Sequence, residues 1–444
     1  MSKTKATAIP RQPEPPTDEE TGSYYLGLSG SPRLVARSSI GPWTLLEDEY
    51  TVSKTIDPVG NHPIVRLWND STGRLRHDIL AAVASIEWTI MDILRVGFSR
   101  RIHTTDEPVE KPITLLVSVQ PDSTPWSLGI EVALRCREIL RQYGIRDVEV
   151  ELMESRLSTS NSTGAKLTSE ALTEPVHVRA QLSEFLGTSI ASANTPLREG
   201  TKELYLRLKG KDKILAVTCR HILFPDDAPN VDQRHNDSAP HLVIQPGEGT
   251  LKVAVGWLAA SIEMNENMIA HALPGLDTTD EEALIQTSQA LQTRFKEAMD
   301  YKQRAIGHLL FSPKTEQDPA IIAESLDEEA IPVAKSGPTS GLTFGLANEA
   351  KSIIRRPCEE EGAEQFTSEE WCIMGIKRWR IERTEFSDKG DSGSCVWDMH
   401  GRAVGMVASG KKARDDGKQD TTYVTPIEWL LKGIRDYGFD VELV

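Results

Sequence analysis

The stretch that decides the fold is residues 389–397, Lys-Gly-Asp-Ser-Gly-Ser-Cys-Val-Trp, followed at 401–410 by Gly-Arg-Ala-Val-Gly-Met-Val-Ala-Ser-Gly. Glycines on both sides of Ser392 allow backbone angles that other residues rarely adopt, so we expect this serine on a tight turn. Two short apolar runs, 395–397 and 403–408, follow it and are separated by a break that contains glycine. This pattern predicts a β-hairpin that begins at the serine turn.

A histidine lies upstream of this turn, at the end of a predicted strand. Residues 214–225 read Ile-Leu-Ala-Val-Thr-Cys-Arg-His-Ile-Leu-Phe-Pro, an apolar run that breaks just before His221. A histidine within hydrogen-bond reach of a serine hydroxyl can take its proton and make the oxygen a nucleophile. The chain order His221 and then Ser392 is one in which such pairs occur. The other histidines have no comparable sequence context.

Taken together, residues 180–440 resemble the trypsin-like serine peptidases of the chymotrypsin clan. They look most like large intracellular fungal members, which carry an α/β segment before the peptidase part. The Gly-Asp-Ser-Gly loop and the Val-Thr pair before His221 carry the resemblance, although Cys-Arg stands where the family often has two alanines. It implies a chymotrypsin-like double β-barrel, with Ser392 as nucleophile and His221 as base. The backbone N–H groups of Gly390 and Ser392 would hold the oxyanion.

The resemblance also implies an acid, which in the family opens a strand as Asp-x-Ala followed by two Leu or Ile residues. The match at 318–322 assigns this role to Asp318. Pro319 departs from the pattern, because proline has no N–H to donate to a strand ladder. Without the acid the imidazole loses control of its tautomer and the rate falls by orders of magnitude. Two functions therefore stay open: a serine endopeptidase, or a catalytically degraded domain used for binding or regulation.

The substrate pocket follows from the same resemblance. Phe386 lies six residues before Ser392, where the family places the base of the side-chain pocket, and Ser409 and Gly410 would line its wall. The absence of an acid at 386 argues against a preference for Arg or Lys and favours a medium or large apolar side chain. Asp391 is implied to brace the loop, not to act as the catalytic acid, and the sequence gives it no partner.

Charge and cysteine content limit the partners and the compartment. The 444-residue chain carries 50 basic and 66 acidic residues, a net charge of −16, which argues against a nucleic-acid partner. No apolar run has the length of a membrane helix, and the first residues lack the apolar core of a secretory signal. The five cysteines show no metal-ligand spacing and are predicted to be reduced and buried. We expect a cytoplasmic protein without cofactor, metal or membrane partner that acts on a protein or peptide.

The chain divides into four predicted segments. These are a disordered tail at 1–22, an α+β domain at 23–153, a Ser/Thr-rich linker at 154–179 and the peptidase-like domain at 180–444. Helical and strand periodicities predict the order helix, strand, strand, helix, strand within the α+β domain, at 75–86, 88–98, 113–119, 128–143 and 148–152.

The peptidase-like domain carries further predicted elements. Strands are expected at 241–245, 251–255, 342–347, 370–376 and 422–426, and a closing helix at 427–437. Residues 277–303 interrupt the β pattern with a capping box and are expected to form a helical insertion. The N-terminal domain and this insertion are the candidate surfaces for a protein partner.

Overall fold

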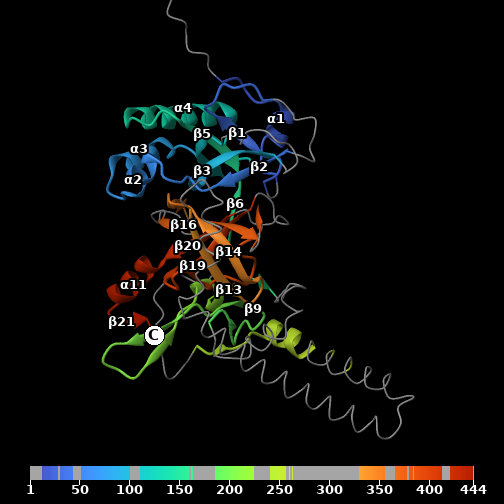
Figure 1. The fold of residues 1–444 in the computed structure, drawn as a ribbon, viewed down its shortest axis with the longest axis vertical. Coiled ribbons are helices and arrows are strands. Elements are labelled where there is room, and N and C mark those ends of the chain that lie inside the picture. The colour runs from blue at the N-terminus through green and yellow to red at the C-terminus, as the bar shows by residue number, and fades with distance from the viewer. Residues whose placement is uncertain are drawn as a thin grey trace, which may run out of the picture.

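The computed structural model describes most of the chain outside a few segments. The described residues are 13–28, 31–43, 52–100, 111–159, 162–163, 186–224, 241–256, 260, 263, 330–355, 366–377, 380–383, 385–412 and 421–443. They form a mostly β structure, in which an N-terminal α/β part lies at one end of an antiparallel barrel (Figure 1). Asp318 and the predicted helical insertion at 277–303 lie outside the described residues.

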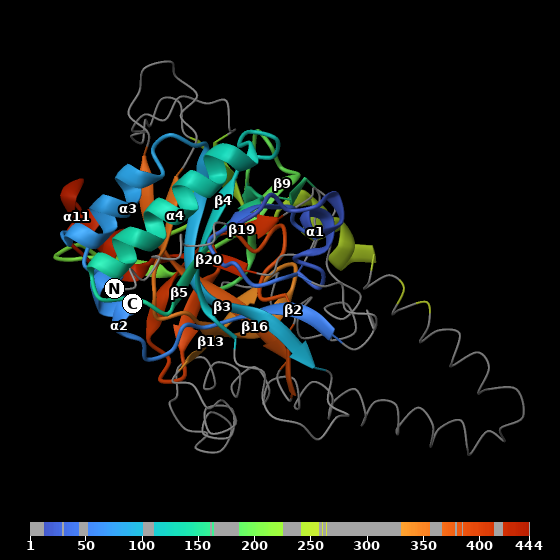
Figure 2. The ribbon, with the colours of Figure 1, turned by 90° about the horizontal axis from the view of Figure 1, so that it is seen from above.

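The N-terminal part has the predicted order of elements. They are α3 (Arg74–Ala82), β3 (Trp88–Arg100), β4 (Ile113–Val119), α4 (Trp126–Gln142) and β5 (Val148–Glu154). The sheet has the order β1-β5-β4-β3, with β1 (Leu34–Arg37) at its edge and β2 (Val52–Asp57) also paired with β3. Strands β4 and β5 are parallel, and α4 forms the crossover between them. Figure 2 shows α3 and α4 lying across this sheet.

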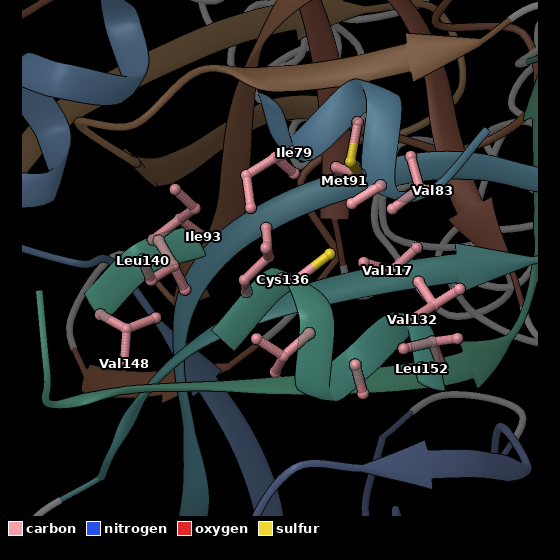
Figure 3. Packing of buried hydrophobic residues seen from close by; sticks show 14 of the residues in the cluster. Ile79, Val83, Met91, Ile93, Val117, Val132, Cys136, Leu140, Val148 and Leu152 are labelled. Atoms are coloured by element: carbon pink, nitrogen blue, oxygen red, sulfur yellow. The ribbon is translucent and has the colours of Figure 1, made fainter. Parts of the chain in front are cut away.

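The core of this part lies between the helices and the sheet. Helix α4 buries Val132, Cys136 and Leu140, which are spaced four residues apart and so share one face. They belong to the same buried cluster as Ile79 of α3 and Ile93 of β3 (Figure 3). The helical period seen in the sequence is therefore the period of burial against the sheet.

The C-terminal half forms a closed six-stranded antiparallel barrel. Its strands pair in a ring in the order β13 (Ile331–Gly337), β14 (Gly341–Ala347), β16 (Thr367–Lys377), β20 (Thr421–Pro426), β19 (Ala403–Lys412) and β18 (Cys395–Asp398). Strand β18 pairs back to β13 and closes the ring. The strands predicted at 342–347, 370–376 and 422–426 all lie in it, and helix α11 (Ile427–Asp436) follows as predicted.

Two smaller sheets flank this barrel. One has the order β12-β8-β9-β7, formed by Val243–Ile244, Ser189–Ser192, Arg198–Thr201 and Ser162–Thr163. The other joins β10 (Tyr205–Leu208) to β11 (Ile214–Ala216) and to β21 (Val441–Leu443) near the end of the chain. Apart from β21, these strands come from residues 162–244, the part of the chain that contains His221.

Three expectations about local structure need correction. The linker predicted at 154–179 contains strand β6 (Arg156–Thr159), which pairs with β19. The strand predicted at 251–255 is wrong, because 248–256 is helical. Thr250 and Ala254 are buried at helical spacing, and Glu248 forms an ion pair with Lys252 one turn later. The disordered tail predicted at 1–22 is too long at its end, because α1 (Asp18–Ser23) is a helix that the Thr17 side chain caps.

A buried polar network joins the N-terminal sheet to the barrel. Strand β3 pairs with β15 (Ser352–Arg355), which pairs with β16, so the sheet continues from one part into the other. The carboxylate of Asp92 on β3 is fully buried and accepts hydrogen bonds from Lys411 Nζ at 2.8 Å, from Tyr423 OH at 3.0 Å and from Ser352 Oγ. Burial, and after it the charge of Asp92, raises the pKa of Tyr423 well above its ordinary value.

Among the described helices, none is both long and apolar enough to cross a bilayer.

Removing the Asp92 carboxylate should destabilise the whole chain. In Asp92→Ala, the Lys411 ammonium stays buried without its counter-charge, and we expect the free energy of unfolding to fall by about 3–5 kcal/mol. The measurement is chemical denaturation. The control is Asp436→Ala, which removes an exposed ion pair with Lys432 and should cost less than about 1 kcal/mol. Equal effects of the two substitutions would contradict the role assigned to the network.

Candidate active site

The structure brings Ser392 and His221 together. Short helix α7 (Arg220–Leu223) presents His221, and the turn before β18 presents Ser392. The distance from Ser392 Oγ to His221 Nε2 is 2.7 Å. The Ser392 residue is buried, and its Oγ also lies 3.5 Å from Cys219 Sγ and 3.4 Å from the Ala408 carbonyl. A hydroxyl and an imidazole at this distance share a hydrogen bond along which a proton can move.

The turn that carries Ser392 is held from two sides. The Ser392 carbonyl accepts a hydrogen bond from the Thr201 N–H at 2.8 Å, and the Gly393 N–H donates to the Val407 carbonyl at 2.8 Å. Gly393 has a φ of +86°, and a Cβ there would lie 2.3 Å from the Thr201 carbonyl oxygen. Only glycine fits this position, because the close approach of β9 leaves no room for a side chain.

Two backbone donors lie on the turn that carries Ser392. Gly390 has a φ of +106°, and its carbonyl accepts a hydrogen bond from Thr201 Oγ1 at 3.0 Å. The Asp391 N–H donates to the Asp388 carbonyl at 3.0 Å. Within the described part of the chain, no acceptor takes the N–H of Gly390 or of Ser392. These are the two donors that the sequence predicts for an oxyanion.

Asp391 has an internal partner, Lys335 on β13. The distance from Lys335 Nζ to Asp391 Oδ2 is 3.1 Å, and both side chains are fully buried. Burial lowers the pKa of Lys335, and the neighbouring Asp391 carboxylate opposes this shift. Asp391 also accepts hydrogen bonds from the N–H groups of Thr339 and Asp388, each at 3.0 Å. The ion pair therefore fixes the residue next to Ser392 to a barrel strand.

Breaking this ion pair should cost more than removing an exposed lysine beside it. Lys335→Met leaves the Asp391 carboxylate buried and uncompensated, and the expected loss is about 3–5 kcal/mol in the free energy of unfolding. The matched control is Lys389→Met, because Lys389 is exposed on the same loop. Denaturation curves of the two variants give the comparison. A Lys335→Met protein as stable as the control would mean that the pair does not hold the loop.

Glu203 is a second buried ionisable group near the site. It lies between β9 and β10, it is fully buried, and neither carboxyl oxygen has a hydrogen-bond partner among the described residues. Burial raises the pKa of Glu203 well above its ordinary value of 4.5. Burial raises the pKa of the Cys395 thiol, and the nearby Glu203 adds to this shift. Nothing in the sequence predicts that Glu203 is buried, because nothing distinguishes it from the other acidic residues.

The raised pKa of Glu203 predicts a pH dependence of stability. The unfolded chain releases this proton near pH 4.5, whereas the folded chain keeps it to higher pH. Between pH 4.5 and the raised pKa of the folded state, stability should therefore fall by about 1.4 kcal/mol per pH unit for this group, and no further above that pKa. Glu203→Gln should remove this loss and be more stable than the wild type at neutral pH. The control is Glu428→Gln at an exposed position; stability curves that do not diverge with pH would contradict the prediction.

The remaining predicted site residues are three that would line the substrate pocket and one that would be the acid. Phe386 is buried in the hydrophobic cluster of the barrel, with Val396, Val407 and Val424, and its role at the base of a pocket stays a prediction. Ser409 and Gly410 lie on β19, directly after Ala408. Asp318 lies outside the described residues, so its role as the acid also stays a prediction.

Four of the five cysteines lie in the described part of the chain. Cys136, Cys219, Cys372 and Cys395 are buried, as predicted, and they form no disulfide with one another. In the described ranges, no group of His, Cys, Asp and Glu side chains has a metal-binding arrangement.

Comparison with protein-family models and with curated proteins finds no match to this sequence.

Proposed function

We propose that the protein is a trypsin-like serine endopeptidase with a chymotrypsin-type double barrel. The observation that carries the proposal is the 2.7 Å contact between Ser392 Oγ and His221 Nε2. The two residues are 171 positions apart, one on the turn before β18 and the other on α7, so no local turn accounts for their contact. The closed barrel supplies the serine, and the region 186–224, which also forms β8 to β11, supplies the histidine.

The geometry supports acyl transfer in two steps. Ser392 Oγ attacks the peptide carbonyl while His221 takes the hydroxyl proton, and the N–H groups of Gly390 and Ser392 stabilise the oxyanion. His221 then protonates the leaving amine as the C–N bond breaks. Water hydrolyses the resulting ester and restores the serine. Asp318 is proposed to orient the imidazole in both steps.

Active-site labelling tests the proposal. A fluorophosphonate probe reacts with an activated serine, so the wild type should label, and Ser392→Ala and His221→Ala should lose at least about 99% of the labelling rate. Asp318→Ala should also label much more slowly if Asp318 is the acid. The control is Ser394→Ala, because Ser394 lies on the same turn with its hydroxyl 3.4 Å from Thr201 Oγ1. Absence of labelling in well-folded wild type would favour the alternative, a degraded domain used for binding or regulation.

A further inference from the structure

One edge of β19 passes three neighbours in turn, and the nucleophile turn is the middle one. Residues 403–406 of β19 pair with β18. The Val407 carbonyl then accepts a hydrogen bond from the Gly393 N–H at 2.8 Å, and the Val407 N–H donates to the Ser394 carbonyl at 2.9 Å. Residues 409–412 pair with β6. Because β20 pairs with the opposite edge along both stretches, β6 covers the same edge as β18, directly beyond the nucleophile turn.

Ala408 separates the two stretches and faces the nucleophile. The pairing between β19 and β20 passes from Val407 directly to Ser409, so Ala408 is a bulged residue. Its carbonyl oxygen lies 3.4 Å from Ser392 Oγ. A peptide carbonyl that reacts with Ser392 must come close to this point. Along this edge, an extended peptide that brings it there can pair only with the stretch after Ala408, because β18 holds the stretch before Val407.

Strand β6 occupies that stretch and points at the nucleophile. Its antiparallel pairs run from Arg156 with Lys412 to Thr159 with Ser409, so β6 approaches the nucleophile in its N-to-C direction. Adding a strand to a sheet edge is a common way in which proteins bind extended peptides. Each main-chain N–H and C=O group of the edge serves one partner strand at a time. An extended peptide and β6 therefore exclude each other from this part of β19.

Strand β6 is anchored at its N-terminal end. It follows β5 after Ser155, whose N–H donates to the Val119 carbonyl at 3.0 Å, and β5 lies between β1 and β4 in its sheet. Arg156 is exposed, and Leu157 packs half-buried against the cluster that contains Tyr423. Figure 1 shows β6 between the N-terminal sheet and the barrel. A movement confined to the residues after Ser155 would thus free the edge of β19 and leave the N-terminal sheet intact.

We propose that β6 is an intramolecular inhibitor of the peptidase, which occupies the edge of β19 that an extended peptide substrate needs. This inference rests on the proposed function. The fraction of chains in which β6 has left the edge then sets the apparent affinity for substrate. Ser392 and His221 are 2.7 Å apart while β6 is in place, so β6 blocks access without separating the catalytic pair. Loss of β6 from the edge should therefore lower the KM and leave the kcat unchanged.

The test compares the full chain with a variant that carries both Ser158→Pro and Thr159→Pro. In an antiparallel pair, the N–H groups of successive residues point to opposite edges, so one of these two points toward β19. The double substitution removes it, and proline is poorly tolerated inside a paired strand. With fluorescein-labelled casein as substrate, the KM of the proline variant should be at least about tenfold below that of the wild type, with the kcat within about twofold.

The matched control replaces the same two residues, Ser158 and Thr159, by alanine. Both N–H groups stay, so the KM should remain within about twofold of the wild type. A second variant, Leu157→Ala, keeps the main chain and removes the contact with the Tyr423 cluster, and its KM should fall by about threefold or more. Structural damage would raise the KM, lower the kcat or slow the labelling of Ser392, so a lower KM distinguishes inhibition from a structural role.

The fluorophosphonate probe separates this inference from the proposed function. The probe has no peptide chain to pair with β19, so the wild type, the proline variant and Leu157→Ala should label at the same rate. Equal labelling with a KM that is unchanged or higher in both variants would overturn inhibition by β6 and leave the peptidase proposal standing. Variants that label but do not cut casein would have the same meaning. No labelling of any of these chains would overturn both.

Discussion

The buried ion pair between Lys335 and Asp391 is the constraint on which the site depends. A carboxylate removed from water needs a counter-charge and hydrogen bonds, and Asp391 has both. Because Asp391 immediately precedes Ser392, its fixed position limits where the serine hydroxyl can lie. The Thr201 N–H and the Val407 carbonyl then hold the turn from the adjoining strands. The position of the Ser392 hydroxyl thus rests on a charge pair inside the barrel.

The N-terminal part is structurally continuous with the barrel. Its strand β3 carries Asp92, which binds Lys411 at the end of the same strand, β19, that passes Ser392. Its strand β5 leads into β6, which pairs with β19 on the edge opposite β20. Both contacts act on β19, so the geometry of this strand depends on two parts of the chain.

Local signals in the sequence were enough to predict the turn at Ser392, the strand before His221 and most barrel strands. Glycine positions and apolar alternation are properties of neighbouring residues, and they predict turns and strands directly. Lys335 could not be predicted as the partner of Asp391, because 56 residues separate them and many lysines were available. The strand prediction at 251–255 was wrong because it rested on alternating apolar residues alone. The ion pair between Glu248 and Lys252, and the burial of residues 250 and 254 one turn apart, favour a helix. Strand β6 was missed because its polar composition is that of a linker, and its pairing with β19 is a contact distant in the sequence.

The pairing of β6 with β19 has a consequence for competition. A tethered strand acts at an effective concentration that a short connection can raise to the millimolar range. A free peptide has to exceed that concentration, weighted by its relative affinity, before it displaces the strand. A free peptide well below that concentration would therefore leave the strand in place, whatever its sequence. The tether is in this sense a concentration threshold, set by chain connectivity and not by the chemistry of the site.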